Sequence, residues 1–203
     1  MNIHLHKGDL PADLKFSGPI AVDSETMGLN PLRDRLCVLQ LSAGDGEVHL
    51  VQFAKGAYDA PVLKKLMCSE DNLKIFHFAR FDLAAIYHHL HVMTQPVFCT
   101  KIASKLVRTY TDRHGLKDLC REMLNVEMSK QQQSSDWGAD ELTEEQCKYA
   151  ASDVLHLHEL MEKLKVLLER ENRTQFAEEC FKFLPTRAIL DLKGWHDMDI
   201  FSH

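Results

Sequence analysis

The stretch Ile20-Ala21-Val22-Asp23-Ser24-Glu25 decides the fold more than any other part of the chain. Its three leading apolar residues predict a short buried strand, and two carboxylates follow at the end of that strand. Because successive side chains of a strand point to opposite faces, Asp23 and Glu25 lie on the same face. Charged side chains are seldom buried without a partner or a metal ion, so this strand end indicates a site.

Further apolar runs on the C-terminal side of this strand predict a mixed α/β fold. We expect a five-stranded sheet, with strands at 20–23, 36–41, 47–53, 73–78 and 97–99. Helices are expected at 61–67 and 81–90, and the pattern from residue 101 onwards is helical until Pro185 breaks it. A mixed sheet flanked by helices, with a helical C-terminal half, follows from this order.

The helix with the clearest start begins after Thr143. Gln146 follows three residues later, and this pair fits a capping box. Tyr149 and Asp153 are four residues apart on this helix, so they share one helical face. The neighbouring positions on that face are apolar, and an aspartate that borders the interior needs a chemical reason.

The composition is that of an ordinary globular protein. The 203 residues predict a single domain, with a core at about 18–170 and a helical tail extension at about 171–203. The formal charge of −6 argues against a protein that coats duplex nucleic acid. The six cysteines form no C-x-x-C pair, and neither a signal sequence nor an apolar membrane-spanning stretch is present, so we predict a soluble cytoplasmic protein.

Four carboxylates and one tyrosine are candidates for a catalytic set: Asp23, Glu25, Asp82, Asp153 and Tyr149. Taken alone, Asp82 fits an acid in the first turn of a helix, where a carboxylate suits the helix dipole. Carboxylate oxygens prefer hard cations such as Mg²⁺ and Mn²⁺. Two such ions about 4 Å apart can clamp the attacking and leaving oxygens of a phosphoryl displacement. A phenol beside them can orient the attacking water.

Three stretches around these residues resemble the exonuclease motifs of the DEDDy class. They are Ile20–Leu29, His77-Phe78-Ala79-Arg80-Phe81-Asp82 and Tyr149-Ala150-Ala151-Ser152-Asp153. The run Lys130-Gln131-Gln132-Gln133-Ser134-Ser135-Asp136-Trp137 is similar to a K-x-x-Q-x-S-D-W run of ribonuclease D-like enzymes. The resemblance spans residues 20–168 and implies a ribonuclease H-like fold, two divalent cations held by the four acids, and 3′-5′ exonuclease activity.

The whole chain looks most similar to the nanoRNase C family of bacteria. That resemblance implies an exoribonuclease that degrades short RNAs, dinucleotides above all, to nucleoside 5′-monophosphates. It also implies a ring-like homo-oligomer, and activity on DNA is associated with the family. The chain departs from ribonuclease D, which carries further C-terminal helical domains, and Asp140-Glu141-Leu142 replaces the R-P-L that often follows S-D-W there.

Ten further residues are expected to bind substrate. The resemblance implies that Leu29 wedges between bases, and Phe81 is expected to stack on one. A local excess of basic residues at 100–121 predicts a group that holds a 5′ phosphate. The remaining expected contacts line the cleft. The full set is Leu29, His77, Phe81, Gln133, Ser135 and Trp137 for the cleft, and Lys105, Arg108, Arg113 and His114 for the phosphate.

Two other functions remain open from the sequence. One is a general 3′-5′ exonuclease that acts on longer RNA or on DNA, since recognition of the 2′-hydroxyl depends on the geometry of the site. The other is a catalytically silent nucleic-acid-binding module on the same fold. The five intact catalytic positions argue against the second.

Overall fold

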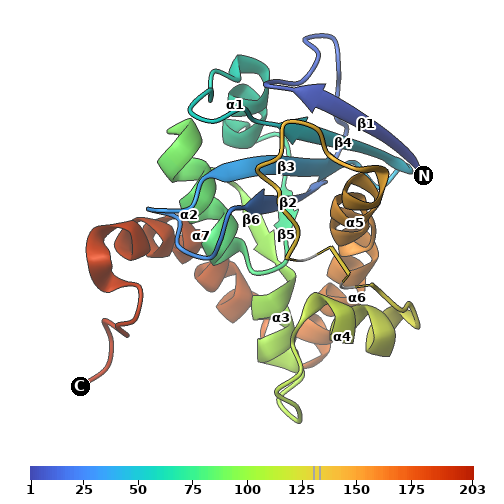
Figure 1. The fold of residues 1–203 in the computed structure, drawn as a ribbon. Coiled ribbons are helices and arrows are strands. Elements are labelled where there is room, and N and C mark those ends of the chain that lie inside the picture. The colour runs from blue at the N-terminus through green and yellow to red at the C-terminus, as the bar shows by residue number, and fades with distance from the viewer. Residues whose placement is uncertain (130, 133) are drawn as a thin grey trace.

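A six-stranded mixed sheet forms the centre of the computed structural model, which describes residues 1–129, 131–132 and 134–203 (Figure 1). The strand order across the sheet is β1-β4-β3-β2-β5-β6. Strand β3 is antiparallel to both of its neighbours, and the other pairs are parallel. The strands are β1 (Asn2–Lys7), β2 (Ile20–Thr26), β3 (Leu36–Ser42), β4 (Glu47–Gln52), β5 (Lys74–Phe76) and β6 (Val97–Cys99).

Helices flank the sheet and make up most of the second half of the chain, so the predicted α/β class is confirmed. Helix α4 and helix α7 each continue into a π-helical turn, at Cys120–Leu124 and Asp191–Trp195. The α-helices are α1 (Pro61–Cys68), α2 (Ala79–Leu90), α3 (Thr100–Val107), α4 (Leu116–Leu119), α5 (Glu144–Leu155), α6 (Leu157–Arg170) and α7 (Thr174–Leu190).

Strand β1 corrects the predicted count of five strands. It forms the edge of the sheet and pairs in parallel with β4, from Asn2 opposite Glu47 to Lys7 opposite Gln52. Its side chains are mostly exposed, so the strand has no buried apolar run to reveal it in the sequence. A parallel partner 45 residues away along the chain gives no local signal either.

Strand β2 lies inside the sheet between β3 and β5, and this placement brings the first motif to the centre of the molecule. Residues Ile20 to Val22 are fully buried, as is most of β3. Helix α5 packs across β1, β2, β3 and β4 (Figure 1). Its capping box at Thr143 and Gln146 is present as predicted. The helix that carries Tyr149 and Asp153 therefore lies directly over the strand that carries Asp23 and Glu25.

Helix α7 corrects the expectation that the helical pattern ends at Pro185. The helix runs from Thr174 to Leu190 with this proline inside it. Proline removes one backbone donor from the helix. Because Phe181, Leu184 and Ala188 form a buried face, and the helix packs on β6 and α2, tertiary packing outweighs that loss.

The segment after α7 is docked on its own chain through one ion-pair cluster. Asp191 accepts hydrogen bonds from Arg80 on α2 and from Arg187 on α7. The same two guanidinium groups donate to backbone carbonyls of residues 195–198. None of the helices in the described part of the chain combines the length and apolar character that crossing a membrane requires.

Candidate active site

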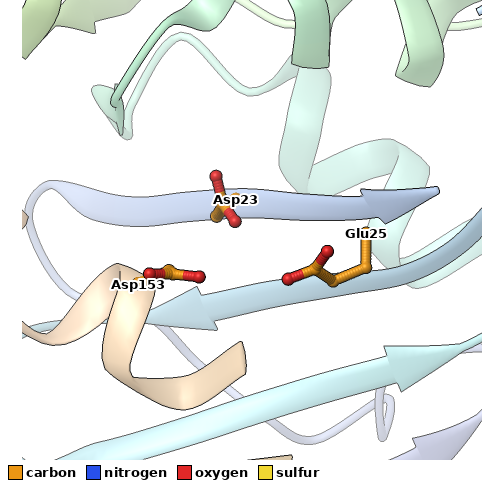
Figure 2. A group of neighbouring side chains, drawn as sticks. All are labelled: Asp23, Glu25 and Asp153. Atoms are coloured by element: carbon orange, nitrogen blue, oxygen red, sulfur yellow. The ribbon is translucent and has the colours of Figure 1, made fainter. Parts of the chain in front are cut away.

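Three of the four predicted acids meet at the face of the sheet that α5 covers. One carboxylate oxygen from each of Asp23, Glu25 and Asp153 lies within 4.8 Å of the other two. Figure 2 shows the side chains of Glu25 from β2 and Asp153 from α5 extending toward each other next to Asp23. The strand alternation predicted for Asp23 and Glu25 is confirmed, and the tertiary fold supplies the third acid.

This cluster is electrostatically unfavourable without a counter-charge. Burial, followed by repulsion from Asp153 and Asp82, raises the pKa of Glu25 to about 9. Burial and the three neighbouring carboxylates raise the pKa of Asp23 well above its usual range. Burial also raises the pKa of Asp153 to about 7, although the nearby Tyr149 hydroxyl partly opposes the shift. Such a group binds a cation in exchange for its protons.

Asp82 lies beside this cluster but is held by a different partner. It sits in the first turn of α2, is 3% exposed, and accepts a hydrogen bond of 2.5 Å from the Ser24 hydroxyl. Ser24 alternates with Asp23 and Glu25, so it reaches α2 on the opposite face of β2. Burial raises the pKa of Asp82 to about 7, and the bond from Ser24 limits that rise. Its negative charge still raises the pKa of Asp23.

Tyr149 faces the acids as its spacing from Asp153 predicted. Burial first, and then the charges of Asp153, Glu25 and Asp23, raise the pKa of its phenol far above neutral pH. The phenol therefore keeps its proton and acts through hydrogen bonds. The Trp137 ring lies 6.0 Å from the Tyr149 ring, centre to centre, and Trp137 is 2% exposed.

A cavity of about 690 Å³ opens over the carboxylates. Six of the ten predicted substrate-binding residues were assigned to this cleft, and five of them line it: Leu29, His77, Phe81, Ser135 and Trp137. The sixth, Gln133, lies outside the described residues. A larger cavity of about 910 Å³ lies between β6, α6 and α7, but none of the four acids lines it.

The cavity-lining residues differ in what they offer a ligand. Leu29 is 87% exposed, as a wedge between bases requires. Burial, and then Lys101, lowers the pKa of His77 to about 3, so its ring is neutral. The Nε2 atom of His77 and the Nε1 atom of Trp137 are buried, and neither has a hydrogen-bond partner within the described ranges. Buried polar atoms of this kind are commonly satisfied by water or a ligand.

The four residues predicted to hold a 5′ phosphate do not line this cavity. Arg108 is 2% exposed and pairs with Glu122, so its guanidinium stabilises the loop after α3. His114 bonds to the Ser104 hydroxyl at 2.8 Å. Lys105 and Arg113 are exposed. Sequence reasoning found the local charge correctly but could not tell a buried arginine from a free one.

Two lysines of the same basic stretch reach the cavity instead. Lys101 at the start of α3 and Lys117 on α4 both line it. Ser24, which holds Asp82, and Phe78, which precedes α2, are further residues that the sequence analysis did not single out. The excess of basic residues at 100–121 is the sequence signal that pointed to the two lysines, and Ser24 and Phe78 lie within the first and second exonuclease motifs.

The residues present fit a divalent cation. Opposite ligands of an octahedral Mg²⁺ site lie about 4.2 Å apart, close to the spread of the Asp23, Glu25 and Asp153 oxygens. The donor set consists of oxygens only, as Mg²⁺ and Mn²⁺ prefer. Bound cations would also remove the repulsion that raises the pKa values of these acids.

Comparison with known proteins agrees with a metal-dependent site of this kind. The family model for 3′-5′ exonuclease matches residues 8–169. The structure of Brucella melitensis NrnC with bound Mg²⁺ is 56% identical over all of both chains, with a TM-score of 0.95. NrnC of this species bound to pGG is 56% identical, covers 100% of this chain and 99% of that one, and has a TM-score of 0.95.

Ribonuclease D of Nitrobacter hamburgensis is a curated relative of this chain. The two are 28% identical over 172 residues, which cover 85% of this chain and 44% of the relative. The chain therefore spans less than half the length of the ribonuclease D relatives that it matches.

Proposed function

The chain belongs to the 3′-5′ exonuclease family and to its NrnC type, and we propose that it removes 3′-terminal nucleotides from short RNAs. Dinucleotides are the proposed preferred substrates, and nucleoside 5′-monophosphates the products. The observation that carries this proposal is the partly buried set of Asp23, Glu25 and Asp153, which lines an open cavity together with Tyr149. A cavity of about 690 Å³ is also of the size that encloses a small ligand.

The proposed metal ligands are Asp23, Glu25, Asp82 and Asp153. Two divalent cations, Mg²⁺ or Mn²⁺, would neutralise these acids and lower the pKa of the attacking water. Tyr149 keeps its phenolic proton near neutral pH, so its hydroxyl orients the water by hydrogen bonding. The hydrogen bond from Ser24 orients the carboxylate of Asp82.

The proposed substrate contacts follow from their place in the cavity. The exposed Leu29 separates two bases, Phe81 stacks on one, and the neutral His77 forms a hydrogen bond to the sugar. Ser135 and Trp137 line the same cavity, and Gln133 remains a predicted contact. A substrate bound here has its 3′-terminal phosphodiester beside the acids.

A general 3′-5′ exonuclease is the second candidate, acting on longer RNA or on DNA. The placement of Arg108 favours it, because a buried, paired arginine cannot measure the distance to a 5′ phosphate. Lys105, Arg113 and His114 also lie outside the cavity of this chain. A length-measuring site would then need Lys101 and Lys117, or residues from a second copy.

A time course on matched substrates separates the two candidates. RNA of two and of seven nucleotides, labelled at the 5′ end, is incubated with the protein and Mg²⁺, Mn²⁺ or a chelator. Fast metal-dependent cleavage of the dinucleotide, with much slower cleavage of the heptamer, supports the dinucleotide preference. Equal rates with a ladder that shortens from the 3′ end support the general exonuclease, and DNA of the same lengths tests the sugar preference.

A ring-like homo-oligomer and a cytoplasmic location complete the proposal. The C-terminal segment exposes Trp195, Met198, Ile200 and Phe201, which a neighbouring subunit would cover. All six cysteines are free thiols, as expected in a reducing compartment. Light scattering that finds only a 23.3 kDa species at micromolar concentration would contradict the oligomer.

A further inference from the structure

Phe78 adopts a backbone conformation that a bulky side chain rarely takes. Its φ is 71° and its ψ is 43°, in the left-handed region. The other non-glycine residues with positive φ in the described ranges are His91, Asn125 and Asn172, and each follows a helix, where this conformation is an ordinary cap. Phe78 instead precedes α2, so helix capping does not account for it.

The strained backbone presents the Phe78 ring at the cavity. Phe78 is 44% exposed and lines the same cavity as the acid cluster. The Lys101 ammonium lies over one face of the ring, 4.1 Å from its centre. Strained backbone conformations cluster at functional sites, so an exposed aromatic ring held in this way beside the acid cluster indicates a role in ligand binding.

We propose that Phe78 and Lys101 form a second base-stacking platform of the substrate site, separate from Leu29 and Phe81. Lys101 covers one face of the ring, so a base stacks on the other face. Base–aromatic stacking tolerates every base, which suits an enzyme that must accept dinucleotides of any sequence. The ammonium lies where it also attracts the phosphate of the stacked nucleotide. This inference rests on the proposed function, because it requires a nucleotide in the cavity.

Affinity measurements with ligands that lack one base test this directly. The full-length protein is titrated, with Ca²⁺ in place of Mg²⁺, against a 5′-phosphorylated diribonucleotide and two analogues that are abasic at the 5′ or at the 3′ position. Phe78→Gly removes the ring and suits the left-handed backbone. Phe78→Trp retains an aromatic face. Tyr110→Leu is the matched control, since Tyr110 is 79% exposed and has Arg108 5.9 Å from its ring centre, outside the cavity.

If Phe78 stacks on a base, the loss of affinity in Phe78→Gly depends on whether the ligand carries that base. We expect Phe78→Gly to weaken binding of the normal dinucleotide about 10-fold or more, and to leave the affinity for one of the abasic analogues unchanged. Phe78→Trp should restore the affinity, Tyr110→Leu should not change it, and the melting temperature of Phe78→Gly should be equal to or higher than that of the wild type.

Three results would overturn the platform. An unchanged affinity in Phe78→Gly would do so, as would an equal loss for all three ligands, because a merely structural role does not distinguish them. A wild-type protein that neither binds nor cleaves the dinucleotide would overturn the platform together with the proposed function. In the first two cases the wild-type protein still cleaves the dinucleotide, so a failure of the platform can be distinguished from a failure of the proposed function.

Discussion

Asp153→Asn should stabilise the metal-free protein while it abolishes turnover. The pKa of Asp153 rises from 3.8 to about 7 in the fold, mainly through burial. The folded state therefore holds a proton that the unfolded state releases, and the wild type loses stability as the pH rises from about 4 to 7. Each pKa unit corresponds to about 1.4 kcal/mol, so three units give at most about 4 kcal/mol at pH 8.

Thermal unfolding in a chelator at pH 8 measures this effect. We expect the melting temperature of Asp153→Asn to exceed that of the wild type by roughly 5–15 °C for a gain of about 2–4 kcal/mol. The difference should vanish below about pH 4, where Asp153 is protonated in both states. Added Mg²⁺ should raise the melting temperature of the wild type more than that of the variant.

Asp191→Asn is the matched control for this prediction. Asp191 has a side chain that is 9% exposed, but it pairs with two arginines, Arg80 and Arg187. Removal of its charge should therefore lower the melting temperature at pH 8. A wild-type protein that is more stable than Asp153→Asn under the same conditions would refute the reasoning that the acid cluster is under electrostatic strain.

Three further changes test the site. Tyr149→Phe should lower kcat by about 100-fold or more and leave KM near the wild-type value, measured by steady-state cleavage of a dinucleotide; an unchanged kcat would exclude a role in orienting water. Leu29→Ala should raise KM without moving the melting temperature, because Leu29 is 87% exposed, and a clear loss of stability would show a structural role instead. Arg108→Ala should destabilise the fold by about 1–3 kcal/mol in chemical denaturation, because it removes the buried ion-pair partner of Glu122 and the donor to the Arg113 carbonyl. The preference for two over seven nucleotides should not change in this variant, and a lost preference would restore the phosphate role.

Local sequence patterns were sufficient for much of the fold and for the two residue pairs that make up the site, Asp23 with Glu25 and Tyr149 with Asp153. The apolar run at 20–22 is buried in β2, and the capping box at Thr143 and Gln146 starts α5 as expected. The alternation of a strand set Asp23 and Glu25 on one face, and helical spacing did the same for Tyr149 and Asp153. These features depend on residues that are close in the chain, so their periodicity is visible in the sequence.

Long-range packing decided the features that the sequence did not predict, and no local sequence pattern indicates such packing. Strand β1 exists because its backbone pairs with β4, and α7 continues through Pro185 because its buried face packs on β6 and α2. Arg108 is buried by its pairing with Glu122, and Phe78 is held at the cavity with a positive φ. The sequence by itself determined which side chains are candidates for the chemistry. The tertiary structure decided which of the basic and aromatic groups reach the cavity, because burial and backbone strain are set by contacts between residues far apart in the chain.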